Sequence, residues 1–234
     1  MSESKVQAFD SLASDYDVWC EQEGKLIFAS EIDALKRILP SLPRPWIEVG
    51  VGSGRFAVAL GIDVGLDPSS RLVEMARDRG VSALLGRGEQ IPFQAGAFGA
   101  VFLIVTLCFL DSPGRTFIES ARLLRSEGKV VLGAVLRENL WGQLYQAKKQ
   151  AGHPLYRYAT FYTYADVETL LTQTGFSIER VVSTLFQNPG KVNHIEVPRE
   201  GFSADAGFAV ILARRTSGQE RSLAILPTRS HSRK

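Results

Sequence analysis

Apolar residues recur at helical spacing through the first forty residues of the chain. Between Phe9 and Leu39 they fall every three or four positions, the spacing of one buried helix face. A segment with three prolines, from Pro40 to Pro45, ends this pattern, because proline lacks the backbone N–H that a helix needs. We therefore expect a helical N-terminal cap, residues 1–44.

Beyond residue 45, short apolar runs alternate with amphipathic segments. The runs predict strands at 46–49, 62–66, 81–85, 100–105, 129–136, 176–186 and 207–213. Strands that alternate with helices predict an α/β fold, a parallel sheet with helices on both faces. One domain, residues 45–215, accounts for this alternation, and we expect residues 216–234 to form a disordered basic tail.

Three glycines at alternate positions follow the first predicted strand. Gly50, Gly52 and Gly54 stand where the strand turns into a helix, and glycine lets a backbone approach a ligand closely. A tight turn without a ligand is one interpretation. A dinucleotide site is a second, but it requires a third glycine at the position of Arg55. The third interpretation depends on a family resemblance.

Residues 48–54 (EVGVGSG) resemble the first motif of the class I S-adenosylmethionine-dependent methyltransferases, an acidic and an apolar residue followed by G-x-G-x-G. Residues 65–69 (GLDPS) are similar to the second motif, G-x-D-x-S. The resemblance implies that Glu48 organises the glycine loop through backbone contacts and that Asp67 binds the ribose hydroxyls. A carboxylate suits that role because it accepts two hydrogen bonds side by side, although Asp67 could also be only a helix cap.

Two further segments follow in the family's order. Residues 86–93 (GRGEQIPF) resemble the loop that covers the adenine edge, with Arg87 where the family usually has Asp or a small polar residue. Residues 98–101 (FGAV) correspond to the family's F-D-x-V, with Gly99 as a departure. The opening segment 13–19 (ASDYDVW) resembles A-x-x-YD-x-W, in which the tyrosine closes over the methionine end of the cofactor; helix packing is the alternative role for Tyr16.

The resemblance is to small enzymes like the ubiquinone/menaquinone-biosynthesis methyltransferases. It implies a Rossmann-like sheet of seven mostly parallel strands in the order 3-2-1-4-5-7-6, the last antiparallel. The implied cofactor is S-adenosyl-L-methionine, and the product is S-adenosyl-L-homocysteine. The expected cofactor-binding residues are Tyr16, Glu48, Gly50, Gly52, Gly54, Asp67, Pro68, Arg87, Gly88, Glu89, Leu103, Ile104 and Thr106.

The sequence defines the acceptor-binding residues less well than the cofactor-binding residues. Many small-molecule members carry two histidines after the fourth strand, where this chain has Cys108 and Phe109. His153 and the aromatic residues Tyr156, Tyr158, Phe161, Tyr162 and Tyr164 lie where relatives place acceptor-lining residues, although they could equally pack the edge of the sheet. The sequence identifies no catalytic residue and no metal ligand.

Composition and charge limit the partners. The 234 residues carry a formal net charge of +2, and residues 214–234, with six basic residues and one acidic, contribute +5, which leaves −3 for the rest. We therefore expect no nucleic-acid partner, which would need clustered Lys and Arg on the fold. No apolar run is long enough for a membrane span. Two separated cysteines and the lack of a signal peptide favour a cytoplasmic protein, a monomer or a homodimer.

Two functions follow from these observations. The first is methyl transfer from S-adenosylmethionine to a small-molecule acceptor by in-line displacement. The alternative is a cofactor-binding fold without transferase activity that serves as an interaction or regulatory module. The departures at Arg87, Gly99 and Cys108 keep this alternative open.

Overall fold

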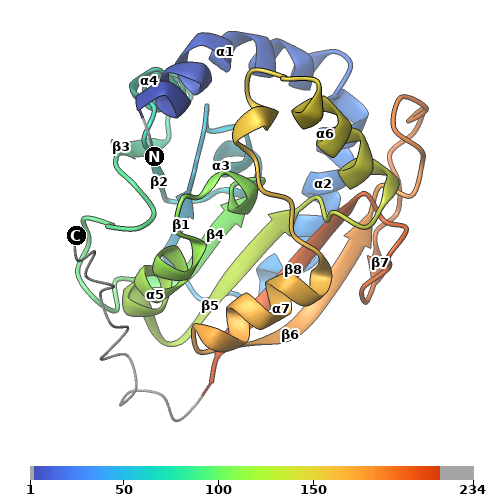
Figure 1. Cartoon of the computed structure of the whole chain (residues 1–234). Coiled ribbons are helices and arrows are strands. Elements are labelled where there is room, and N and C mark those ends of the chain that lie inside the picture. Colours follow the sequence, from blue (N-terminus) through green and yellow to red (C-terminus); the bar gives the residue numbers. More distant parts are fainter. Residues whose placement is uncertain (1–2, 217–234) are drawn as a thin grey trace, which may run out of the picture.

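An eight-stranded sheet forms the centre of the computed structural model, which describes residues 3–216 (Figure 1). The strand order is β3-β2-β1-β4-β5-β8-β6-β7, and β3, β2, β1, β4 and β5 pair in parallel. The strands are β1 (Trp46–Val49), β2 (Val64–Asp67), β3 (Ser82–Leu85), β4 (Phe98–Ile104), β5 (Leu124–Ala134), β6 (Phe176–Thr184), β7 (Arg199–Glu200) and β8 (Phe208–Arg215).

The predicted sheet is confirmed, with one additional strand. The last strand, β8, is antiparallel to both β5 and β6, between which it lies. The additional strand, β7, is a two-residue pair with Val182 and Ser183 of β6 at the sheet edge. It falls inside a segment, residues 187–206, that carries no strand pattern.

Helices cover both faces of the sheet because each face of the central strand is apolar. All seven residues of β4 are buried, and alternate side chains point to opposite faces, as in any strand. Phe102 belongs to a cluster of buried side chains that includes residues of α2, α3 and α4, whereas Val101 and Leu103 belong to a second cluster that includes residues of α5 and α7. The helices are α1 (Glu3–Glu21), α2 (Lys25–Lys36), α3 (Arg55–Leu60), α4 (Ser70–Asp78), α5 (Pro113–Leu123), α6 (Leu140–Gln150) and α7 (Tyr164–Gln173).

The N-terminal segment forms two helices rather than one. A break at residues 22–24 separates α1 from α2, so that α2 packs on the sheet near β6 while α1 crosses the top of the molecule (Figure 1). In α1, the buried residues are Lys5, Ala13, Asp17 and Cys20, so the helix uses charged as well as apolar side chains to attach to the core.

Gly99, where the family has an acidic residue, is explained by packing. A side chain at this position would overlap the Pro43 carbonyl, because the segment before β1 crosses directly over Gly99. This departure therefore reflects close backbone contact and says nothing about loss of activity.

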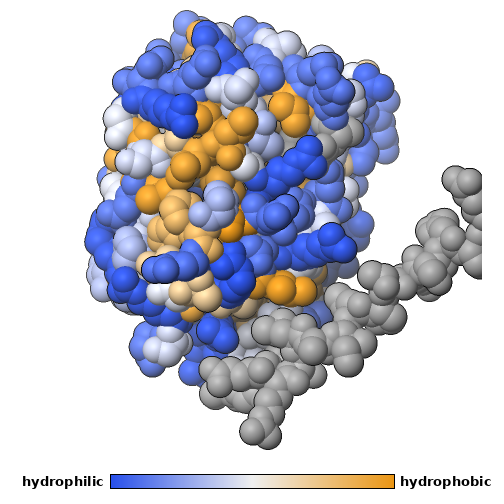
Figure 2. All heavy atoms as spheres, turned by 90° about the vertical axis from the view of Figure 1, so that its left-hand side faces the viewer, coloured by the Kyte–Doolittle hydropathy of each residue, from blue (hydrophilic) through white to orange (hydrophobic). Residues whose placement is uncertain are grey.

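The side of the molecule that carries β3 and α4 has a band of apolar side chains on its surface (Figure 2). Leu85 of the edge strand β3 is 58% exposed. Within residues 3–216, no helix is long and apolar enough to cross a bilayer. The predicted basic tail lies outside the described residues except for Thr216, whose N–H donates to the Gly175 carbonyl at 2.9 Å.

Candidate active site

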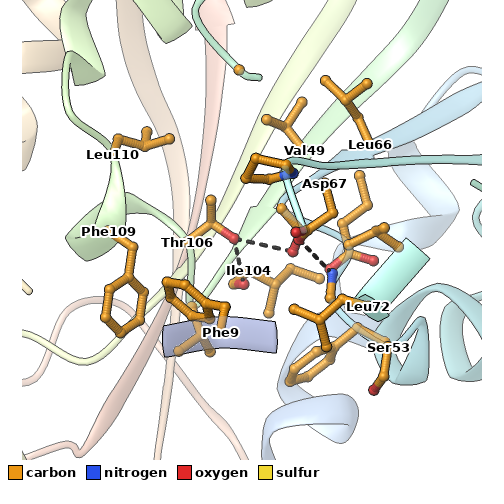
Figure 3. Close-up of a pocket in the computed structure, with 18 of the residues that line it drawn as sticks. Phe9, Val49, Ser53, Leu66, Asp67, Leu72, Ile104, Thr106, Phe109 and Leu110 are labelled. Atoms are coloured by element: carbon orange, nitrogen blue, oxygen red, sulfur yellow. Dashed lines mark hydrogen bonds between the residues drawn. The ribbon is translucent and has the colours of Figure 1, made fainter. Parts of the chain in front are cut away.

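A cavity opens at the carboxyl ends of β1, β2 and β4, beneath helix α1 (Figure 3). This is the edge of an open parallel sheet at which ligands bind, next to the point where the strand order reverses. The loops after these three strands form one side of the cavity. Phe9, Leu12, Ala13 and Tyr16 of α1 form the other side.

The three loop glycines are needed for different reasons, although all have a positive φ. A side chain at Gly50 would overlap Thr106, and one at Gly54 would come within 3.1 Å of Ala76 in α4. A side chain at Gly52, by contrast, would meet nothing within 4 Å. Gly52 lines the cavity, so it is the glycine whose missing side chain leaves room for a ligand.

Asp67 stands at the end of β2 and is connected to the glycine loop. Its carboxylate accepts the Gly52 N–H at 3.0 Å and the Ser69 N–H at 2.9 Å, and the side chain lines the cavity (Figure 3). Burial raises the pKa of Asp67 to about 6, a rise to which the charge of Asp10 adds and which the two backbone donors oppose. The carboxylate is therefore partly dehydrated and ready to accept hydrogen bonds from a ligand.

Glu48 lies beneath the glycine loop, inside β1. Its side chain is 1% exposed and lines the cavity, and burial together with the nearby Asp67 raises the pKa of Glu48 well above its usual value. Within residues 3–216 its carboxyl makes no hydrogen bond, and its Oε2 is buried without a partner. The expected backbone contacts from Glu48 to the loop are thus not formed.

The remaining predicted residues divide into two groups. Those that line the cavity with Gly50, Gly52, Glu48 and Asp67 are Tyr16, Pro68, Arg87, Gly88, Glu89, Ile104 and Thr106. Leu103 and Gly54 do not line it: Leu103 is fully buried on the α5 side of the sheet, and Gly54 packs against α4. Glu89 also accepts the Ser112 N–H at 3.3 Å, and Thr106 donates to the Ile104 carbonyl at 3.0 Å.

Polar contacts attach α1 to the loops after β1 and β2. The buried Asp17 carboxylate accepts hydrogen bonds from Ser53 Oγ at 2.6 Å, from Arg55 Nε at 2.6 Å and from Arg79. These donors lower the pKa of Asp17 despite its burial, so it stays ionised at neutral pH. Asp10, about two helical turns before Asp17, accepts a hydrogen bond from the Ser69 hydroxyl after β2.

A third attachment joins α1 to the loop after β4. The buried Lys5 ammonium donates to the Phe109 carbonyl and, at 2.9 Å, to Asp111. Lys5, Asp10 and Asp17 therefore connect α1 to each of the three loops that surround the cavity. The sequence predicted none of these contacts, because they join residues that are 36 to 106 positions apart.

A second cavity adjoins the first. Leu12, Tyr16, Val105, Phe109 and Tyr156 belong to the walls of both, so the two spaces meet at these side chains. Several residues predicted to face an acceptor line this second cavity, namely His153, Tyr156, Phe161 and Tyr162, and Cys108 lines it as well. Tyr158 and Tyr164 are not part of its wall. Burial raises the pKa of the Cys108 thiol to about 12, so the thiol is protonated and unreactive at neutral pH.

Comparisons with known proteins agree with this geometry. The methyltransferase domain family matches residues 47–132. An uncharacterized protein of Mycobacterium tuberculosis is 41% identical over 203 residues, which are 86% of this chain and 71% of the relative. An uncharacterized protein of Methanocaldococcus jannaschii is 33% identical over 90% of this chain and 100% of its own length.

A solved structure extends the similarity. A Thermotoga maritima S-adenosylmethionine-dependent methyltransferase, described as a possible histamine N-methyltransferase, superposes with a TM-score of 0.83 at 34% identity and covers 90% of this chain and 99% of its own. The chain belongs to the class I S-adenosylmethionine-dependent methyltransferases. Its cofactor is S-adenosylmethionine, and the cavity fits this group because Gly52 leaves it open and Asp67 faces it. The ubiquinone/menaquinone subgroup stays a prediction.

The affinity of the protein for S-adenosylhomocysteine is expected to fall as the pH drops below about 6. The role expected for Asp67 is to accept hydrogen bonds from two ribose hydroxyls, which its ionised form can do through both oxygens and its protonated form cannot, so each pH unit below its pKa of about 6 is expected to cost up to about tenfold in affinity. Asp10 and Glu48 are the other carboxyls near Asp67, and Glu48 stays protonated over this range. Calorimetry at pH 5 and 7.5 tests this; an equal affinity at both values would contradict it, and Asp67→Asn should bind weakly at both.

Proposed function

We propose that this methyltransferase transfers the methyl group of S-adenosylmethionine to a small-molecule acceptor that enters the second cavity. The observation that carries the proposal is the shared wall: the two cavities meet at Tyr16, Val105, Phe109 and Tyr156. A cofactor in the first cavity could therefore contact an acceptor in the second. The name of the Thermotoga maritima structure, a possible histamine N-methyltransferase, supports a small-molecule acceptor.

The chain's own residues have two tasks in such a reaction, positioning and the exclusion of water. When bound, S-adenosylmethionine supplies a methyl group on a positively charged sulfur, which accepts the electron pair of the broken bond. Asp67 and the glycine loop would hold the adenosyl part, and Leu12 and Tyr16 of α1 would cover the junction of the cavities. The contacts of Asp17 with Ser53, Arg55 and Arg79 hold α1 in this place.

Turnover with a mixed acceptor pool tests the proposal. Purified protein, labelled cofactor and a pooled extract of small metabolites should yield S-adenosylhomocysteine at a rate at least about tenfold above that of Asp67→Ala, which loses two ribose hydrogen bonds of about 1 kcal/mol or more each. Asp78→Ala is the matched control, because it removes an exposed carboxylate from the end of α4. Tight cofactor binding without turnover on any extract would favour a binding module instead.

A further inference from the structure

The second cavity has a wall that is mostly aromatic or aliphatic. It encloses about 320 Å³, which suits a small organic molecule. Its aromatic residues include Trp19, Phe109, Tyr145, Tyr156 and Phe161, and the rings of Tyr145 and Tyr156 have centroids 4.7 Å apart. Among the described residues, the wall contains only two charged side chains, Asp15 and Lys148, together with one histidine, His153. These few polar groups are the ones that can select a substrate class.

Lys148 places an unpaired positive charge at the mouth of the cavity. It lies near the end of α6 and is exposed, and its ammonium lies 5.4 Å from the ring centre of Tyr145 and 5.8 Å from that of Tyr156. Ring faces attract a cation but carry no net charge. Within residues 3–216, the ammonium makes no hydrogen bond and no ion pair. Its charge is therefore positioned by the two rings without being neutralised.

His153 supplies a hydrogen-bond donor beside this charge. Its Nδ1 accepts the N–H groups of Leu155 at 3.3 Å and of Tyr156 at 3.5 Å. Since Nδ1 is an acceptor, the proton of the neutral ring is on Nε2, which is then a donor. Burial and the nearby charge of Lys148 lower the pKa of His153, so the ring is neutral at pH 7.5. In the part of the chain that the structure describes, Nε2 has no acceptor.

Lys148 and His153 form one local unit. The backbone N–H of His153 donates to the Lys148 carbonyl at 3.0 Å, and the His153 ring lies 4.6 Å from that of Tyr156, the ring that Lys148 also approaches. Two donors and a positive charge are thus collected around one aromatic ring. Two donors match the two oxygens of a carboxylate, and hydrogen bonds to an ionised acceptor are stronger than neutral ones.

We propose that the acceptor carries a carboxylate, which Lys148 and His153 bind at the mouth of the second cavity while an apolar or aromatic body fills the rest. This inference rests on the proposed function, because it assigns a substrate class to the same site. The carboxylate is the group that is held, not the group that is methylated. Lys148 and His153 line the second cavity only, whereas the atom that takes the methyl group must bring a lone pair to the wall that both cavities share.

The test compares three probes of one shape, 3-phenylpropionate, 3-phenylpropionamide and 3-phenylpropylamine, on protein saturated with S-adenosylhomocysteine at pH 7.5 and low salt. A carboxylic acid with a pKa near the roughly 4.3 of glutamate is ionised at this pH. The acid should bind at least about fivefold more tightly than the amide, a modest factor because the exposed mouth is partly screened by solvent. Lys148→Met should remove that preference and change the affinity for the amide by less than about twofold.

Lys36→Met is the matched control, because it removes an exposed lysine from the end of α2 that lines neither cavity, and it should keep the preference for the acid. Asp15→Asn should strengthen binding of the acid, because it removes the negative charge from the same wall. His153→Phe should weaken binding of both the acid and the amide, since each has an oxygen that can accept from Nε2.

Three results would overturn the inference alone. They are equal or undetectable binding of acid and amide, a preference for the acid that survives in Lys148→Met, and tightest binding of the amine with loss of that binding in Asp15→Asn. The last result would favour a cationic acceptor. Failure of the protein to bind S-adenosylhomocysteine would instead overturn the proposed function and this inference together, so the two failures are distinguishable.

Discussion

Gly52→Val is expected to reduce the affinity for S-adenosylhomocysteine by at least about 100-fold while the protein still folds. A side chain at Gly52 meets no protein atom within 4 Å, so the added methyl groups would enter the space that the ligand needs. A loss of 100-fold corresponds to about 2.8 kcal/mol, which lies near the top of the roughly 1–3 kcal/mol that forcing extra methyl groups into a filled space costs. Calorimetry on the variant and on the unchanged protein measures the difference.

Gly80→Val provides the control for backbone strain. Gly80 also has a positive φ, +85° against +54° for Gly52, and a side chain there would also meet nothing within 4 Å, but it lies outside the cavity at the end of α4. Both variants should lose a similar amount of thermal stability, because valine is strained at a positive φ. Equal cofactor affinity in the two variants would remove Gly52 from the cofactor site.

Glu31→Gln is expected to make the protein more stable at alkaline pH, on the order of 4 kcal/mol at pH 9. The pKa of Glu31 is about 8 in the folded chain and close to 4.5 in the unfolded chain. Between these values the folded state keeps a proton that the unfolded state has lost, so stability falls as the pH rises from about 4.5 to about 8 and then levels off. Glutamine cannot ionise, so the stability of Glu31→Gln does not decrease in this way as the pH rises.

Urea unfolding at pH 5 and at pH 9 measures the effect. The stability difference between Glu31→Gln and the unchanged protein should be small at pH 5 and large at pH 9. Asp33→Asn, which removes an exposed carboxylate from the same helix, should show no such growth. The raised pKa values of Glu48 and Asp67 affect all three proteins equally and cancel in the comparison. A difference that does not grow with pH would mean that Glu31 has a partner in solution.

The part of the site that the sequence predicts well is the part built from neighbouring residues. Gly52 and Asp67 are found because each belongs to a short motif at the end of a strand, and parallel strands bring their carboxyl ends together. Leu103 shows the limit of this approach. It follows the motif by position, but in a strand successive side chains point to opposite faces, and its side chain points to the α5 side.

The contribution of α1 was harder to predict. Tyr16 could be proposed from its resemblance to an opening motif, but Phe9 and Leu12 are ordinary apolar positions of an amphipathic helix. Their place over the cavity depends on the contacts of Lys5 and Asp17 with distant loops, and no local pattern reports such contacts. Strand β7 was missed for a similar reason: two exposed charged residues carry no strand pattern.

Glu31 did leave a signal in the sequence. It lies four positions after Ile27 and four before Leu35, and both are buried on the face of α2 that packs on the sheet. An acid at a core position of an amphipathic helix breaks the polar–apolar pattern, and such breaks are expected mainly at functional sites.

The position of α1 has a consequence for any shortened form of this enzyme. A chain trimmed to begin at residue 45 would keep the loops after β1 and β2 with Gly52 and Asp67, which are expected to hold the adenosyl group. It would lose Phe9, Leu12 and Tyr16, and with them the side of the cavity that faces those loops and part of the boundary toward the second cavity. Bulk water would then reach the methyl-donor end of the cofactor site, so we expect the motif-bearing part of the chain not to be a competent catalyst by itself.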